Sequence, residues 1–104
     1  MFWYDHLYLG RNCIYRVNRL KYKITHRMPH PSVYLITLSQ GPNTVLEMIP
    51  SNLLMQETYP RETLKIIGIG ATRGEALELI RQIVDEVYQK QGNFDIAAYM
   101  ESGK

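Results

Sequence analysis

Between residues 64 and 91, an apolar run leads through a short loop into an amphipathic stretch. The run 64–70 is short and apolar, as a buried strand is. Beyond the loop, apolar residues recur at helical spacing over about half of the circumference, and charged residues fill the rest. Thr72 and Glu75 have the spacing of a capping box, and Gly92 is a typical helix stop. The pattern predicts a strand, a tight loop and a long helix that packs on a sheet.

The other elements are shorter. Residues 2–9 alternate loosely and predict a strand with three residues on each side, namely Trp3, Leu7 and Leu9 against Tyr4, His6 and Tyr8. Residues 11–28 favour a helix, because six apolar residues fall within an arc of roughly 120°; these are Cys13, Ile14, Val17, Leu20, Ile24 and Met28. Alternation over residues 20–25 leaves a strand open as the rival interpretation. Residues 33–39 and 44–49 predict a hairpin through a turn at 40–43, and residues 51–56 predict a short helix capped by Ser51.

This order predicts an α+β fold with two layers, in which a mixed sheet of about four strands is covered by two main helices. A ferredoxin-like variant is one option for its topology. The chain of 104 residues is long enough for one core, so we expect a single domain over residues 1–104. Near the end, Phe94, Ile96 and Tyr99 are expected to dock on the body of the domain.

The small number of cysteines and the absence of long apolar stretches indicate the cellular compartment. The single cysteine, Cys13, excludes an internal disulfide framework and favours a reducing compartment. No stretch approaches roughly 20 apolar residues, and the first residues lack the basic region of a signal peptide. We therefore expect a cytoplasmic protein without a membrane segment.

Charge is unevenly distributed along the chain. Residues 1–46 carry a net charge of +5, whereas residues 47–104 carry −3. On a helix over residues 11–28, four cations share one strip and three rings share the next; they are Arg16, Arg19, Lys23 and Arg27, and Tyr15, Tyr22 and His26. Such a surface can bind a phosphate backbone and stack a base, although a solvated basic face is the commoner outcome of a charge run. A nucleic-acid interface here is a hypothesis.

The loop 68–74 invites comparison with dinucleotide-binding turns. Its spacing is G-x-G-x-x-x-G, whereas the dinucleotide fingerprint is G-x-G-x-x-G. Close packing of the helix on the strand is the favoured explanation of Gly68 and Gly70. The remaining hypothesis is a weak anion or nucleotide site, formed by Gly70, Thr72, Arg73 and Gly74.

Metal binding and catalysis find little support. His26 and His30 have the spacing of two ligands on one helical face, but Pro29 lies between them. Cys13 belongs to the apolar arc, where a buried thiol would be inert. The sequence shows no recognisable catalytic Ser-His-Asp set and no recognisable pair of catalytic carboxylates. We therefore expect no metal, no cofactor and no catalytic residue.

Three segments carry a resemblance. PSVYLITL (31–38), NTVLEMIPSNLLMQ (43–56) and GIGATRGEALELIRQIVDEVYQKQGNFDIAAY (68–99) look similar to short uncharacterised proteins of Gram-positive anaerobic bacteria. The resemblance implies a bacterial cytoplasmic setting and no particular chemistry. Our leading expectation is a non-enzymatic protein-interaction module. Tyrosine-bearing strand edges or the acidic helix face would contact the partner protein, which in one version is a second copy of the chain. The alternatives are a nucleic-acid-binding accessory protein using residues 11–27 and a small nucleotide- or anion-binding protein using residues 68–74.

Overall fold

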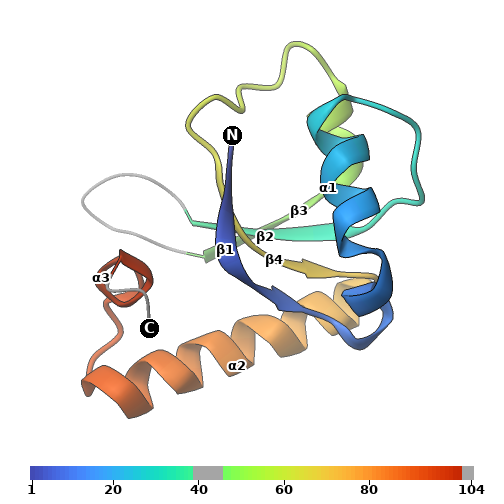
Figure 1. Ribbon diagram of the computed structural model, residues 1–104. Coiled ribbons are helices and arrows are strands. Elements are labelled where there is room, and N and C mark those ends of the chain that lie inside the picture. Colours follow the sequence, from blue (N-terminus) through green and yellow to red (C-terminus); the bar gives the residue numbers. More distant parts are fainter. Residues whose placement is uncertain (39–45, 102–104) are drawn as a thin grey trace.

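The computed structural model describes residues 1–38 and 46–101. Within these ranges, one mixed sheet contains β1 (Phe2–Leu9), β2 (Tyr34–Leu38), β3 (Leu46–Pro50) and β4 (Lys65–Gly70) (Figure 1). The strand order is β1-β4-β2-β3. β1 is parallel to β4, whereas β2 is antiparallel to both β4 and β3. The α+β class and the hairpin are confirmed, while the turn expected at 40–43 lies outside the described residues.

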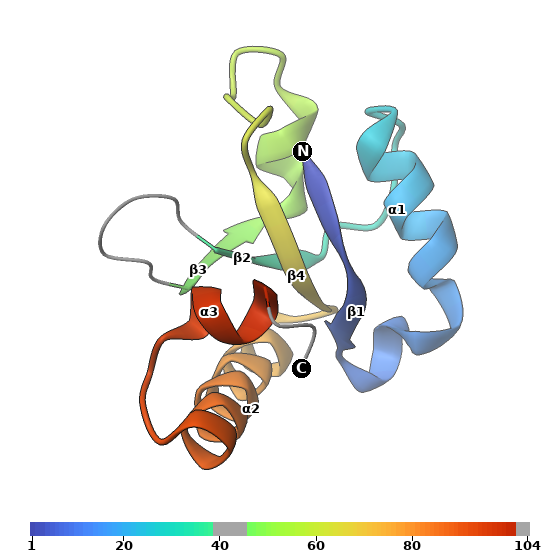
Figure 2. The same ribbon diagram turned by 60° about the vertical axis from the view of Figure 1, so that its left-hand side comes forward.

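Helices cover both faces of this sheet (Figures 1 and 2). One face carries η1 (Arg11–Arg16), α1 (Val17–Thr25) and η2 (Ser51–Met55), and the other carries α2 (Arg73–Gln91) and α3 (Ile96–Glu101). The two-layer expectation is therefore corrected to three layers. The physical reason is that β2 and β4 are apolar on both sides, and such strands need cover on both faces. A ferredoxin-like domain has the order β-α-β-β-α-β; here the short 3₁₀ helix η2 stands between β3 and β4, and α2 and α3 follow β4.

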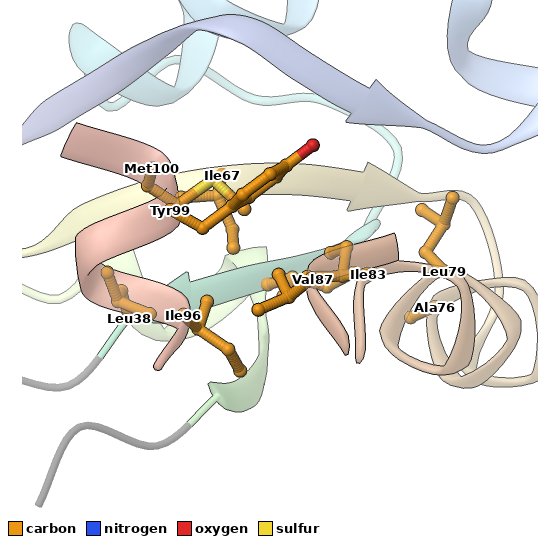
Figure 3. Close-up of a cluster of buried hydrophobic side chains, with 10 residues drawn as sticks. Leu38, Ile67, Ala76, Leu79, Ile83, Val87, Ile96, Tyr99 and Met100 are labelled. Carbon is orange, nitrogen blue, oxygen red and sulfur yellow. The ribbon is translucent and has the colours of Figure 1, made fainter. Parts of the chain in front are cut away.

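Two hydrophobic clusters follow from the alternation along the strands. Leu35 and Ile66 face α1, whereas Ile36 and Ile67 face α2 and α3. Figure 3 shows the second cluster, in which side chains of α2 and α3 meet those of the sheet. The two predicted sides of β1 are confirmed by the same division, because Trp3, Leu7 and Leu9 pack in the first cluster and Tyr4 and Tyr8 in the second. Ile96 and Tyr99 are buried as expected, but Phe94 is exposed.

The long helix begins and ends where the sequence indicates. The Thr72 hydroxyl accepts the Glu75 amide at 3.1 Å, and Gly92 ends the helix in the left-handed region at φ 74°. In an ordinary capping box, the glutamate side chain accepts the backbone amide of the cap residue, which here would be Thr72. The glutamate of this helix has a different donor. The Glu75 carboxylate accepts the amide of Ala71, one residue before the cap.

The first helix departs from ideal periodicity at both ends. Residues 11–16 form a 3₁₀ helix, and the α-helix ends at Thr25. Because a 3₁₀ helix has three residues per turn, Ile14 leaves the apolar arc and is exposed. Met28 lies beyond the helix end and is exposed too. The helical interpretation of this segment is confirmed for residues 11–25.

Ser51 does not cap η2, contrary to the prediction. Its hydroxyl accepts the backbone amide of Val33 at 3.0 Å and lies 2.9 Å from His30 Nε2. Because Ser51 is buried, its hydroxyl joins the start of η2 to the segment that leads into β2. Within the described ranges, no helix combines the length and the apolarity that are needed to cross a bilayer.

Candidate nucleic-acid interface

The contacts that hold α1 on the sheet determine which of its side chains face solvent. Leu20 and Ile24 are buried against the sheet, so the opposite side of the helix faces solvent. At the C-terminal end, the Arg61 guanidinium donates to the carbonyls of Ile24 at 3.0 Å and Thr25 at 2.6 Å. Its cation also suits the negative end of the helix dipole. Burial, followed by the charge of Arg27, lowers the pKa of Arg61.

Arg19 and Lys23 lie one helical turn apart on α1 and are neighbours on its surface. Arg19 is exposed and Lys23 is partly exposed. Between residues 11 and 27 there are six basic side chains and no acidic one. In the described part of the chain, neither Arg19 nor Lys23 has a carboxylate within 4.0 Å, and the ion pairs found there join Arg81 to Glu78 and Asp85 on α2. Their charge is therefore available to an anionic partner.

Exposed aromatic rings occur on the same stretch of chain, with Tyr15 on η1 and Tyr22 on α1. Tyr15 is 98% exposed and Tyr22 is 58% exposed, which is unusual for large rings. The ring of Tyr22 stacks on that of His26, with centroids 4.2 Å apart and planes inclined by 32°. On the other flank of α1, the Lys21 ammonium lies 5.9 Å from the centre of the Trp3 ring.

The predicted basic strip is shorter than expected. Arg16 belongs to η1, and its Nε donates to the Asn12 carbonyl at 3.0 Å. Arg27 follows the helix end and has a positive φ of 52°. Tyr15 belongs to η1 as well. Of the residues predicted for the interface, only Arg19, Lys23 and Tyr22 lie on α1, so these three residues form its centre. Sequence reasoning missed Arg61, whose contacts with α1 join positions far apart in the chain.

The acidic part of the chain lies on the other side of the sheet. Between residues 73 and 101 there are six acidic side chains against three basic ones. Most of these residues form α2 and α3, which cover the face opposite to α1 (Figures 1 and 2). Glu75, at the start of α2, is an exception because it contacts Asn12 of η1. A polyanion that contacts α1 is thus separated by the sheet from the acidic residues further along α2 and on α3.

The loop of the anion hypothesis is occupied by a carboxylate of the protein itself. Glu75 Oε1 accepts the Ala71 amide at 3.0 Å, and Glu75 Oε2 accepts the Asn12 side-chain amide at 3.0 Å. An incoming anion would meet this like charge at the start of α2. The geometry therefore disfavours an anion there, although Arg73 and Gly74 are exposed beside it.

Gly70 and Cys13 serve packing near the same loop. A Cβ at Gly70 would lie 2.7 Å from the amide nitrogen of Ala76, so the glycine allows α2 to approach β4 closely. Cys13 is buried as predicted. Burial and then the charge of Glu75 raise the pKa of its thiol, which favours the unreactive protonated form.

The tyrosine side chains of β1 pack against the cluster formed with α2 and α3, and they do not form an exposed aromatic sheet edge for a partner protein. Tyr8 and Tyr99 both donate hydroxyl hydrogen bonds to Glu86 Oε2, the second at 2.9 Å. Burial, followed by the hydrogen bond to Glu86, raises the pKa of both hydroxyls, so they remain protonated donors. Tyr4 packs in the same cluster.

Both outer strands also carry features that discourage strand addition. The register of β1 against β4 shifts between Trp3 and Tyr8. β3 is short, exposes Glu47 and ends at Pro50. Irregular pairing, charge and proline are common devices that protect sheet edges from further pairing. The edge-based version of the protein-interaction hypothesis thus loses support, because the strongly exposed tyrosines lie elsewhere.

The two histidines of the metal hypothesis do not converge. His26 Nδ1 lies 2.8 Å from the Tyr22 carbonyl, and the His30 ring bridges the Met28 carbonyl and Ser51. Residues 1–38 and 46–101 contain no group of three metal-ligating side chains. Comparisons of the chain with models of protein families, with curated proteins and with solved structures found no match, so the resemblance to proteins of anaerobic bacteria stays a prediction.

Proposed function

We propose that this protein binds nucleic acid through the outward face of α1, without regard to sequence. The observation that carries the proposal is the pair Arg19 and Lys23, whose charges have no acidic partner in the described part of the chain. Cations along a helix neutralise successive phosphates and release counterions, and this release supplies most of the affinity in non-specific binding.

A polymer suits this surface better than a small anion does. Arg19 and Lys23 lie on a convex helix and are spaced by roughly 6 Å along its axis. Small ligands prefer concave sites that surround them. An extended phosphate backbone can follow the helix instead, and the acidic layer across the sheet restricts contact to this face. We propose the cytoplasm as the setting and an accessory, non-enzymatic role.

The first prediction concerns the salt dependence of binding. Arg19→Glu should weaken binding of a fluorescently labelled oligonucleotide and should reduce the slope of log affinity against log salt by about 0.7 to 0.9 for each phosphate that the variant no longer neutralises. Fluorescence anisotropy measured from about 50 mM to 200 mM salt would report both quantities. The reason is that the substitution removes a cation and introduces a repelling carboxylate.

The matched control is Lys90→Glu, which changes the net charge equally but lies in the last turn of α2, across the sheet. Its affinity and slope should stay close to those of the wild-type protein. If both variants weaken binding equally, only the overall charge matters and the assignment to α1 is wrong. Wild-type anisotropy that stays flat at about 50 mM salt would refute nucleic-acid binding altogether.

A protein-interaction role, including a homodimer, is the second candidate. The observation in its favour is the stacked pair Tyr88 and Phe94, whose ring centroids are 4.9 Å apart and which are 50% and 62% exposed. Aromatic residues of this kind are enriched at protein interfaces. Light scattering that gives the mass of a monomer would contradict the homodimer.

A further inference from the structure

We infer that the nucleic acid bound by α1 is single-stranded, with its bases stacked on the rings of Tyr15 and Tyr22. This inference rests on the proposed function and adds the substrate class. Arg19 and Lys23 would hold the phosphate backbone, the neighbouring ring of Tyr22 on α1 would take one base, and Tyr15 on the preceding η1 would take another.

Tyr15 is the first reason. The residue is 98% exposed, and within the described part of the chain its ring stacks on no other ring. A tyrosine ring can bury roughly 150 to 250 Å² in a contact, so the fold leaves that stabilisation unused. A base offers a flat apolar face of matching size, and every base has one.

The pair of Tyr22 and His26 is the second reason. His26 Nδ1 lies 2.8 Å from the Tyr22 carbonyl, which fixes the imidazole beneath the phenol ring. The ring of Tyr22 is therefore held in place before any ligand arrives, yet more than half of the residue remains exposed. A preorganised ring loses less conformational entropy when a base stacks on it.

The arrangement favours a single strand over a duplex. Tyr22 and Arg19 are three positions apart on α1, so ring and cation are neighbours on its surface. In a duplex the base faces are already stacked on one another, and proteins reach only the base edges through the grooves. In a single strand, bases can turn onto aromatic rings while cations follow the backbone. The exposed rings of Tyr15 and Tyr22 match the second case.

The test compares a fluorescein-labelled oligothymidine of about 20 nucleotides with a duplex of the same length, at low salt. Tyr15→Leu and Tyr22→Leu should each reduce affinity for the single strand by about 5- to 150-fold. Neither should change the salt slope, because no charge is altered. Tyr22→Phe keeps the ring and should retain the affinity of the wild-type protein.

Tyr88→Leu is the matched control, since Tyr88 is an exposed tyrosine on α2, and it should have no effect on affinity. Circular dichroism of each variant verifies the fold, which the almost fully exposed Tyr15 ring does little to support. Duplex bound as tightly as oligothymidine, or leucine variants that bind like the wild-type protein, would overturn this inference and leave the proposed function intact. Failure of the wild-type protein to bind either probe would refute the proposed function itself.

Discussion

Gly70→Ala should destabilise the protein by roughly 1 to 3 kcal/mol, and Gly70→Val should cost more. A Cβ at Gly70 would lie 2.7 Å from the nitrogen and 2.9 Å from the Cα of Ala76. Both are backbone atoms of α2, which cannot turn aside as a flexible side chain can. The helix would have to move away from β4, and the buried stripe of α2 would pack less closely on the sheet. The midpoint of urea-induced unfolding measures the destabilisation.

The same substitution at Gly74 is the control. Gly74 lies in the first turn of α2, and a Cβ there would meet no heavy atom within 4 Å. Alanine favours helix over glycine by up to about 1 kcal/mol, so Gly74→Ala should be neutral or stabilising. If alanine lowers the free energy of unfolding at Gly70 but raises it at Gly74, four residues away, the effect of packing is separated from that of backbone preference. Equal effects at both would contradict the close approach of α2 to β4.

Glu86→Leu should destabilise the protein by roughly 2 to 4 kcal/mol, because two tyrosine hydroxyls lose a charged acceptor. Glu86 accepts from Tyr8 on β1 and from Tyr99 on α3, so one carboxylate connects three elements. We expect the amide protons of α3 to exchange faster with solvent in this variant than in the wild-type protein. Urea unfolding and hydrogen exchange would measure the two effects.

Two substitutions act as controls for Glu86→Leu. Glu86→Gln keeps an oxygen that can accept from both hydroxyls, so its cost should be smaller. Asp85→Leu removes an exposed acid from the next position, where the ion pair with Arg81 is exposed to solvent and contributes little. A cost for Asp85→Leu as large as that for Glu86→Leu would show that the tyrosine contacts do not stabilise the fold.

Local patterns in the sequence predicted the elements and the sides of the strands. The two sides of β1 were correct, because alternation places Trp3 and Tyr4 on opposite faces whatever the partner strand is. The 3₁₀ segment before α1 was not foreseen, since a projection at 100° steps presupposes an α-helix. The apolar character of residues 33–39 and 64–70 on both faces was a signal for three layers.

Contacts between distant positions account for what the sequence could not predict about the candidate site. Arg61 contacts the end of α1 from 37 positions away, and Asn12 contacts Glu75 from 63 positions away. No periodicity reports such pairs. The capping-box spacing of Thr72 and Glu75 did indicate that the Glu75 carboxylate turns back toward the helix start, which is why it lies in the loop of the anion hypothesis. The exposed position of Arg19 and Tyr22 followed from helical spacing alone.

The most direct test of the interface is nuclear magnetic resonance of the isotope-labelled protein titrated with oligothymidine at low salt. We expect backbone amide shifts to change in η1, in α1 and in the residues up to Arg27, with the largest changes near Arg19 and Tyr22. Amides of α2 and α3, across the sheet, should stay unchanged. Shifts concentrated on α2 or α3, or no shifts at any oligothymidine concentration, would contradict the claim that α1 carries the function.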